Sequence, residues 1–403
     1  MNSLVYQIGI KVLEIYLNLA SLSGNEKAKK AKIGRRNWKK HLALFKQNKK
    51  TYWIHAASHG EAIMALPIIE KILNEKTNQV TMSFFSASGF ENFNYKSSRF
   101  FKFYLPIDKK NNYKKLIEFL NPKLLLFIKY DLWLNLISDC HNRGIPTILV
   151  SAKFRKKQWY FKHFGKKAKD VLKTMSCIFT IDKSSEKLLI KNNFKNVNYS
   201  GDTRYDQVSN GADKNINLII NNPCVILGSS WREEEKYAAE IIQKMDNINW
   251  IIVPHEIQNH KLRKTKSLFG DNCSLLSNTD LSKPIPKVLI IDKIGILSSL
   301  YNFSDIAFVG GGFSGKLHNI LEAGVKGNII MFGPKTENYP EAELLFNKNL
   351  AFKINNSLEL KNTIETLLNN PKELNKKQDK IIQFIKAQKG ATEKIWREIE
   401  KMV

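Results

Sequence analysis

The 403-residue chain has few of the residues that build disulfide scaffolds or zinc sites. Its four cysteines, at positions 140, 177, 224 and 273, show no paired spacing, which argues against both and is typical of a reducing compartment. Acidic residues are also scarce: the chain has 37 Asp and Glu but 64 Lys and Arg, which gives a formal net charge of +27. This excess indicates an anionic partner, such as a phosphorylated substrate or an acidic membrane. Nucleic acid is disfavoured, since no RNA-binding pattern with interleaved aromatics occurs.

No long uninterrupted hydrophobic run is present. Residues 4–22 are apolar, but Lys11 and Glu14 interrupt them, so they do not supply the roughly 20 apolar residues of a spanning helix. Early positive charge and a small-residue cleavage site, the marks of a signal peptide, are not clear either. The apolar residues recur instead at the spacing of an amphipathic helix: Val5, Ile8, Val12, Ile15, Tyr16 and Leu19.

A basic cluster over residues 27–40 follows this helix and includes Arg35, Arg36 and Lys39. An apolar helix face followed by basic residues is typical of a helix lying on an anionic membrane surface. A core helix followed by a solvated charged loop is the alternative.

What the chain does have is enough apolar sequence for two α/β domains. Its hydrophobic content is 43%, and its length predicts two domains of roughly 180 residues each. Short apolar runs alternate with helical segments, which predicts parallel sheets with helices on both faces. The predicted organisation is an amphipathic helix over 1–25, an N-terminal domain over 26–212 and a C-terminal domain over 213–403, whose last helix has apolar positions for docking back.

One candidate catalytic residue follows the first predicted strand, residues 52–56. Glu61 lies where this strand passes into a helix, at the edge where α/β domains place ligands. The helix dipole favours an ionised carboxylate there, which suits a general base that takes a proton from a substrate hydroxyl. The alternative is a charge that only stabilises the helix N-terminus.

A glycine-rich turn follows the predicted strand 306–309. Residues 310–312 are all glycine, which allows a sharp turn and close approach to a ligand. A helix predicted from about His318 would offer free N–H groups to an anion, and Glu322, one turn in, could accept hydrogen bonds from a ribose. A tight turn in any α/β protein is the alternative.

Two further strand ends carry polar groups. Ser229 or Ser230 can cap the helix that follows the strand 224–227, and Arg232 can pair with a phosphate or carboxylate. His255 ends the strand 250–256 at the same predicted edge. A surface arginine and a structural histidine are the ordinary interpretations of the last two.

Together these segments resemble the 3-deoxy-D-manno-octulosonic acid (Kdo) transferases, and the likeness runs through nearly the whole chain in the family's order. The segments that carry it are Gly-Arg-Arg-Asn-Trp-Lys at 34–39, Trp-Ile-His-Ala-Ala-Ser-His-Gly-Glu at 53–61, Gly-Ser-Ser-Trp-Arg-Glu-Glu-Glu at 228–235, Val-Pro-His-Glu at 253–256, and residues 310–333 with their His-Asn-Ile-Leu-Glu core at 318–322.

The resemblance implies a GT-B fold, with two Rossmann-like domains facing each other across a cleft. It implies an inverting, metal-independent transfer of Kdo from CMP-Kdo to the lipid A precursor at the cytoplasmic face of the inner membrane, with no cofactor. Glu61 matches the family's proposed base. The residues that fall on the donor side are Ser229, Ser230, Arg232, His255, Gly311, Gly312, Asn319 and Glu322, and Arg35, Arg36 and Lys39 fit the acceptor phosphates and lipid.

The chain departs from the family at residues 129–133, where many members carry Glu-Thr-Glu-Leu-Trp. Lys129 replaces the first acid and Asp131 shortens the second, so only Asp131 can keep a catalytic role. Trp231 and Arg232 also differ from the common Thr-His. Two alternatives stay open: a GT-B transferase that uses another nucleotide sugar such as a UDP-sugar, and a non-catalytic basic protein that binds anionic lipid.

Overall fold

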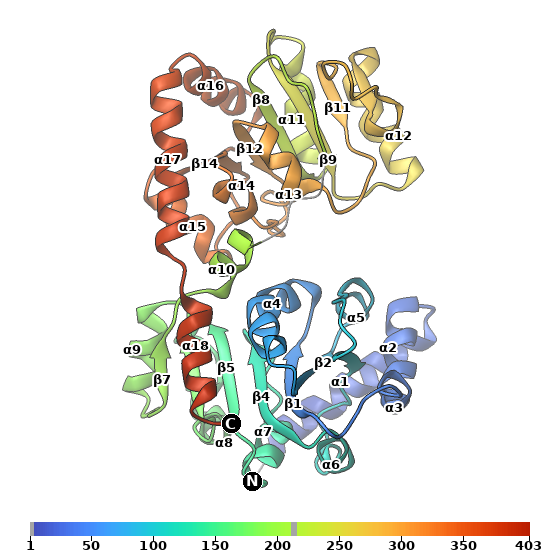
Figure 1. Ribbon diagram of the computed structural model, residues 1–403, viewed down its shortest axis with the longest axis vertical. Coiled ribbons are helices and arrows are strands. Elements are labelled where there is room, and N and C mark those ends of the chain that lie inside the picture. Colours follow the sequence, from blue (N-terminus) through green and yellow to red (C-terminus); the bar gives the residue numbers. More distant parts are fainter. Residues whose placement is uncertain (1–3, 211–215) are drawn as a thin grey trace. The chain divides into compact units, whose positions relative to one another are not determined.

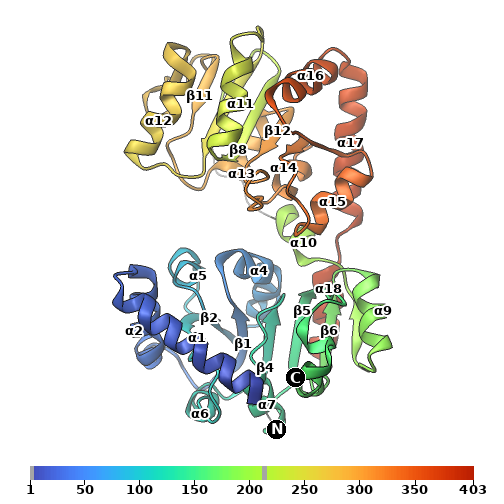
Figure 2. The same cartoon turned by 180° about the vertical axis from the view of Figure 1, so that it is seen from behind.

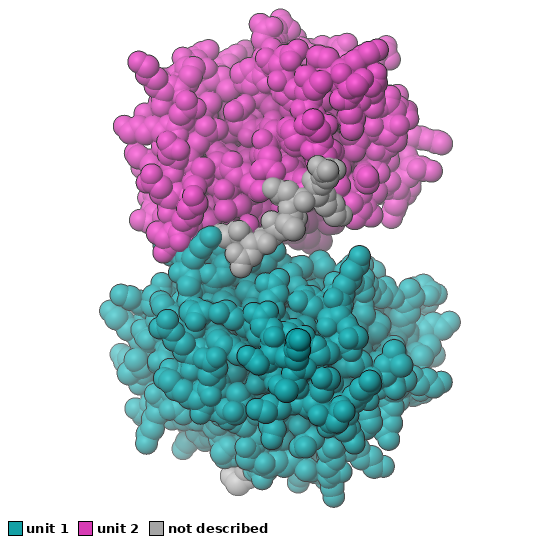
Figure 3. Space-filling model, in the orientation of Figure 1, with its two compact units in different colours: residues 1–207, 388–403 teal, residues 208–387 magenta. Residues whose placement is uncertain are grey.

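The computed structural model describes residues 4–210 and 216–403, which form two compact units (Figures 1 and 3). Unit 1 comprises residues 1–207 and 388–403, and unit 2 comprises residues 208–387. Each unit contains a parallel sheet of seven strands, which confirms the predicted α/β class. The predicted boundary between residues 212 and 213 lies outside the described residues.

The sheet of unit 1 has the strand order β3-β2-β1-β4-β5-β6-β7, so the chain reverses its direction across the sheet between β1 and β4. Its strands are β1 (Lys50–Ala56), β2 (Asn78–Phe84), β3 (Phe100–Tyr104), β4 (Pro122–Ile128), β5 (Thr147–Ala152), β6 (Cys177–Thr180) and β7 (Val197–Tyr199). The helices between them are α2 (Glu26–Arg36), α3 (Trp38–His41), α4 (His59–Asn74), α5 (Ala87–Asn92), α6 (Lys114–Leu120), α7 (Leu134–His141), α8 (Lys166–Leu172), α9 (Lys183–Lys191) and α10 (Thr203–Asn210).

Alternation along β1 sorts its side chains between two core layers. Tyr52 and Ile54 pack in the layer that contains the buried side chains of α4, whereas Trp53 packs in the layer that contains those of α7. Successive side chains of a strand point to opposite faces of the sheet. The helices after β1 and β4 therefore cover opposite faces.

The predicted amphipathic helix is confirmed as α1 (Leu4–Leu22), which lies beside α2 in unit 1 (Figure 2). Ile10 is its one buried residue. The predicted apolar stripe points to solvent instead of a core: Val5, Ile8, Val12, Ile15, Tyr16 and Leu19 are all at least half exposed. Among the described residues, none of the helices is long and apolar enough to cross a membrane.

Several polar contacts hold α1 to unit 1, among them an ion pair between Glu14 Oε1 and Lys109 Nζ at 2.6 Å. The hydroxyl of Tyr6 donates to Asp108 Oδ2 at 2.5 Å, and the amide of Gln7 donates to Asn135 Oδ1 at 3.0 Å. Asp108 also accepts the backbone N–H groups of Asn135 and Leu136 in the first turn of α7. Burial raises the pKa of Asp108 to about 6, although these hydrogen bonds favour its charged form.

The sheet of unit 2 has the order β10-β11-β9-β8-β12-β13-β14, with its reversal between β8 and β12. The strands are β8 (Cys224–Ser230), β9 (Asn249–Pro254), β10 (Cys273–Leu275), β11 (Val288–Ile290), β12 (Ile306–Val309), β13 (Ile329–Phe332) and β14 (Ala351–Lys353). The helices are α11 (Arg232–Ile242), α12 (Asn259–Phe269), α13 (Leu297–Leu300), α14 (Leu321–Val325), α15 (Pro340–Asn347), α16 (Ser357–Leu368) and α17 (Pro371–Ala387). The short edge strands β10 and β14 lack a clear apolar run and were not predicted.

The last helix, α18 (Ala391–Glu400), returns to unit 1, where Ile395 and Ile399 are fully buried in the layer beside α4. Asp206 in α10 holds the start of this helix. Its carboxylate accepts the N–H groups of Gly390 and Thr392 and the Thr392 hydroxyl, each at 2.7 Å. Both ends of the chain therefore belong to unit 1.

Asp206→Ala is expected to lower the free energy of unfolding of unit 1 by about 2 kcal/mol, because it leaves three buried donors without an acceptor. Urea unfolding of the full chain measures this change. Asp379→Ala, at an exposed position of α17, is the control and is expected to change the value by less than about 0.5 kcal/mol. Equal effects of the two substitutions would contradict the assigned role of Asp206.

Candidate functional site

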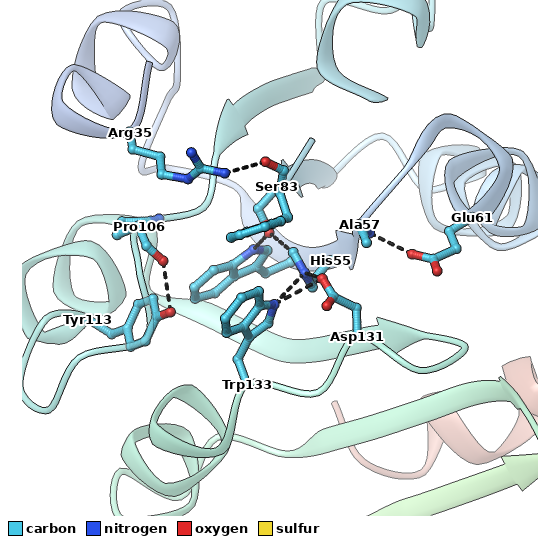
Figure 4. A network of polar contacts seen from close by, with 11 residues as sticks. Arg35, His55, Ala57, Glu61, Ser83, Pro106, Tyr113, Asp131 and Trp133 are labelled. Atoms are coloured by element: carbon cyan, nitrogen blue, oxygen red, sulfur yellow. Dashed lines mark hydrogen bonds and ion pairs between the residues drawn. The ribbon is translucent and has the colours of Figure 1, made fainter. Parts of the chain in front are cut away.

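Glu61 lies at the carboxyl end of β1, in the first turn of α4. Its Oε2 accepts the backbone N–H of Ala57 at 2.6 Å (Figure 4), so the carboxylate folds back over the start of its own helix. This bond performs the helix-stabilising task that sequence reasoning gave as the alternative. It occupies one oxygen and leaves Oε1 with no hydrogen bond among the described residues.

Burial raises the pKa of Glu61, which is the opposite of what its place near a helix N-terminus suggests. The hydrogen bond from Ala57 opposes the shift, the charge of Asp131 adds to it, and His55 and Lys129 oppose it. A carboxylate with a raised pKa is a stronger base when ionised. The site therefore makes Glu61 better suited to accept a proton than an exposed glutamate.

Asp131 follows β4, the strand next to β1 at the reversal. Its Oδ2 lies 2.7 Å from His55 Nε2 and 3.0 Å from the indole nitrogen of Trp133 (Figure 4). His55 is fully buried. Sequence reasoning assigned Asp131 to the site but gave His55 no role, although a histidine within an otherwise apolar strand is the signal that could have found it.

The basic residues predicted to act together after α1 are separated by the structure. Arg36 and Lys39 are exposed. Arg35 instead turns inward, lies over the ring of Phe85 at 4.4 Å and donates to the Phe85 carbonyl at the end of β2. Burial lowers the pKa of Arg35 to about 10, and its Nε is buried without a hydrogen-bond partner. Arg35 therefore belongs to the same sheet edge as Glu61.

The glycine loop of unit 2 is shaped by backbone packing. A Cβ at Gly310 would lie 2.2 Å from the Ser229 carbonyl oxygen, and one at Gly312 would lie 2.4 Å from the Gly333 nitrogen. Gly311 has a φ of +90°, a conformation that favours glycine. The N–H groups of Gly310 and Gly311 already bond to Gly228 and Glu234. Neither N–H group is therefore free to bind an anion, in contrast to the predicted role of this turn.

The helix after this loop also begins later than predicted. α14 starts at Leu321, not near His318, and it has five residues. Asn319 accepts the Leu321 N–H at 3.1 Å and donates to Glu322 Oε1 at 3.0 Å. Burial raises the pKa of Glu322. Asn319 and Glu322 thus satisfy each other in the absence of a ligand.

The predicted serine cap of α11 is wrong, because the N-cap residue is Trp231. The Ser230 hydroxyl donates instead to the buried Glu235, and Glu234 accepts the N–H groups of Trp231 and Gly311 at 3.0 and 2.8 Å. Ser229 has a φ of +52°. Sequence reasoning treated Glu234 and Glu235 only as acidic residues of a first turn. Glu234 joins the loops that follow β8 and β12, and Glu235 joins Ser230 to Thr265 in α12.

A cavity of about 310 Å³ lies at the carboxyl ends of β8 and β9. It is lined by Ser230, Trp231, Arg232, Glu235, Pro254, His255, Glu256, Lys261, Lys264 and Thr265. The rings of Trp231 and His255 stack with centroids 4.6 Å apart, and the His318 ring lies at the same distance from His255, tilted by 38°. The structure therefore brings Ser230, Arg232 and His255 together at one cavity, as the sequence suggested, and adds Trp231.

Comparison with known proteins identifies the family. The sequence profile for 3-deoxy-D-manno-octulosonic-acid transferases (kdotransferases) matches residues 36–207. The 3-deoxy-D-manno-octulosonic acid transferase of Aquifex aeolicus is 28% identical over 337 residues, covering 82% of this chain and 89% of that protein. Residues 36–207 thus match the Kdo transferase family, and proteins named as Kdo transferases are similar to this chain over 79% or more of its length.

Two further similarities extend the comparison. A bifunctional glycosyltransferase/methyltransferase of Fusobacterium nucleatum is 26% identical over 341 residues, and the match covers 79% of this chain but 52% of that protein. Among solved structures, UDP-GlcNAc 2-epimerase from Neisseria meningitidis superposes with a TM-score of 0.60 at 15% identity, covering 87% of this chain and 100% of the other. At this identity the likeness shows the fold alone, which is the predicted GT-B fold.

The lowered pKa of His318 predicts that the stability of the protein depends on pH. Burial, with a smaller effect of His255, lowers the pKa of His318 from 6.5 to about 4. Between these values the unfolded chain binds more protons than the folded one, so stability contributed by the neutral ring is present above pH 6.5 and is lost as the pH falls toward 4. Urea unfolding measures the free energy of unfolding at pH 7 and at pH 5. The difference between these two free energies should therefore be smaller for His318→Gln than for the wild type.

His260→Gln is the matched control, because His260 is exposed on α12. It is expected to keep the wild-type difference between the two pH values. A His318→Gln variant that also keeps this difference would contradict the burial of an uncharged His318.

Proposed function

We propose that the chain transfers Kdo from CMP-Kdo to the lipid A precursor. The observation that carries this proposal is the family match over residues 36–207, because that range includes Glu61, Asp131 and the whole edge around them. Relatives named for the same transfer, at 79% coverage or more of this chain, support it further. Unit 2 then holds the donor and unit 1 the acceptor.

The donor fits the cavity at the ends of β8 and β9 because cationic side chains line it. Arg232, Lys261 and Lys264 offer positive charge to a phosphate. The stacked rings of Trp231 and His255 offer a flat surface to a pyrimidine base. Departure of CMP creates negative charge on its phosphate, and cations already in place stabilise that charge as it forms.

The acceptor reacts beside Glu61. A sugar hydroxyl of the acceptor attacks the anomeric carbon of Kdo, the bond from that carbon to the phosphate oxygen breaks, and CMP leaves with the bonding electrons. Glu61 takes the hydroxyl proton as the new bond forms. Attack on the face opposite the leaving group inverts the anomeric configuration. Asp131, whose Oδ1 has no hydrogen bond among the described residues, accepts one from the acceptor sugar.

Glu61→Gln tests this assignment. It keeps the shape of the side chain but removes the base, so kcat for transfer is expected to fall about 10²- to 10⁴-fold. The assay is the mass gain of the lipid A precursor on incubation with CMP-Kdo. CMP should still raise the Tm of the variant as it does for the wild type, because the donor cavity is unchanged.

Glu70→Gln, at an exposed position of the same helix, is the control and should transfer Kdo at the wild-type rate. Near-normal turnover of Glu61→Gln would contradict the role of Glu61. A rise in Tm with UDP but not with CMP, together with no mass gain from CMP-Kdo, would contradict the proposed donor.

We also propose that α1 lies on the cytoplasmic face of the inner membrane. The proposed acceptor of the transfer, the lipid A precursor, resides in the same membrane face. The support is the exposed stripe on α1, in which Ile8 is 55% and Leu19 60% exposed, together with Arg36 and Lys39, exposed on the elements that follow. Apolar side chains gain free energy on leaving water, and cations are attracted to anionic headgroups.

Ile8→Glu combined with Ile15→Glu is expected to reduce binding to vesicles of anionic phospholipid at least tenfold in a sedimentation assay, because it places two carboxylates at the contact. Leu358→Glu combined with Ile294→Glu makes the same change at exposed positions of unit 2 and serves as the control. Equal vesicle binding by both double variants would argue against docking through α1.

A further inference from the structure

A chain of hydrogen bonds connects the core of unit 1 to Asp131 (Figure 4). Trp53 Nε1 donates to Ser83 Oγ at 2.8 Å, Ser83 Oγ lies 2.9 Å from His55 Nδ1, and His55 Nε2 lies 2.7 Å from Asp131 Oδ2. Trp133 Nε1 lies 3.0 Å from the same carboxylate oxygen. Two strands, β1 and β2, and the loop after β4 therefore supply a single network.

The donors and acceptors of this network determine the tautomer of His55. Indole nitrogens only donate, and an ionised carboxylate only accepts. The 2.7 Å contact between His55 and Asp131 therefore needs its proton on Nε2. The other ring nitrogen then accepts from the Ser83 hydroxyl, whose oxygen accepts from Trp53. With the proton on Nε2, the contacts of His55 with Asp131 and Ser83 are satisfied. Trp133 Nε1, which lies 2.9 Å from His55 Nε2 and 3.0 Å from Asp131 Oδ2, then donates to the carboxylate, an assignment that rests on this accounting.

The network is closed at its inner end, so it does not relay protons. Its last member is the indole of Trp53, which is fully buried and has no lone pair to accept a proton. His55 is also fully buried and cannot contact a substrate. Asp131 is the outermost charged member, with 24% of its side chain exposed, and its second oxygen stays free of hydrogen bonds among the described residues.

Strand alternation explains why His55 can perform this task. His55 lies two residues after Trp53, so its side chain points to the face of the sheet that α7 covers, whereas Glu61 stands in α4 on the opposite face. The loop after β4 carries Asp131 and Trp133 over the end of β1. His55 thus reaches from beneath the sheet edge to the carboxylate whose charge acts on Glu61.

We propose that His55 is a positioning residue for the transfer: its Nε2–H fixes Asp131, so that the free carboxylate oxygen of Asp131 orients the acceptor sugar whose hydroxyl Glu61 deprotonates. This inference rests on the proposed function. It assigns no catalytic step to His55 itself. It also gives a physical reason for an aspartate at 131, because the histidine beneath it holds the carboxylate in one place.

Two substitutions at one position separate positioning from folding. The amide nitrogen of Gln reaches the place of Nε2 and keeps the donor to Asp131, whereas Asn reaches only the place of Nδ1 and keeps the contact with Ser83. In transfer assays, His55→Asn is expected to lower kcat at least tenfold with an unchanged KM for CMP-Kdo. His55→Gln is expected to retain kcat within threefold of the wild type.

A pH profile supplies a readout that a purely structural role would not move. The groups that act on Glu61 are the Ala57 N–H, His55, Lys129 and Asp131, and of these Asp131 raises its pKa. Asp131→Asn should therefore shift the acid limb of kcat/KM to lower pH. His55→Asn should move the acid limb as well, because it releases Asp131 and removes a group that lowers the pKa of Glu61.

The outcomes separate this inference from the function on which it rests. Wild-type kcat in His55→Asn, with Glu61→Gln inactive, would overturn the positioning role alone. Turnover by Glu61→Gln would overturn the assigned base. Activity losses in His55→Asn and His55→Gln that follow their losses of unfolding free energy, with no shift of the acid limb, would show that His55 only supports the fold. A loss of kcat in His55→Asn, a retained kcat in His55→Gln and a shifted acid limb of the kcat/KM profile would together establish the positioning role.

Discussion

Parallel strands end at one edge of a sheet, and the helices that follow two neighbouring strands can leave toward opposite faces. In unit 1 this happens after β1 and β4, and in unit 2 it happens after β8 and β12. Where the connections part, the edge is left open to a ligand. Glu61 and Asp131 follow one such pair of strands, and the loops that begin near Ser230 and Gly310 follow the other. The strand order therefore explains where the unit 1 site lies, whereas the cavity of unit 2 lies beside the reversal, at the ends of β8 and β9.

An open edge needs its own internal support, since backbone and side-chain polar groups there are partly removed from water. In unit 1 the support is the network from Trp53 to Asp131 and the bond from Ala57 to Glu61. In unit 2 it is Glu234, which joins the loops after β8 and β12, and Glu235, which joins Ser230 to Thr265 in α12. Each unit thus holds its edge together with carboxylates that accept hydrogen bonds from neighbouring loops. The same burial that makes these bonds necessary raises the pKa of Glu61, Glu234 and Glu235.

Much of this fold could be predicted from the sequence, because buried parallel strands are short continuous apolar runs, such as residues 123–128. The predictions failed where such a run is absent or where a tertiary contact decides the structure. β10 and β14 are three-residue edge strands, too short to show a pattern. The helix predicted from about His318 begins only at Leu321, whose N–H bonds to the side chain of Asn319 within the predicted span. The glycine triplet suggested a ligand, but its glycines are required by contacts with Ser229 and Gly333, residues far away in the sequence.

By itself, the sequence determined the α/β class, the two sheets, the apolar stripe of α1 and the motifs shared with the Kdo transferases, because periodicity and motif order are local properties. Only the tertiary structure decided that this stripe faces solvent and which polar residues meet. It turned Arg35 inward, away from Arg36 and Lys39, occupied the N–H groups of Gly310 and Gly311, and placed His55 against Asp131. The physical reason is that these partners come from separate strands and loops, 50 to 77 residues apart in the cases of Arg35 with Phe85, His55 with Asp131 and Glu234 with Gly311, and a local pattern cannot specify which distant donor will satisfy a buried acceptor.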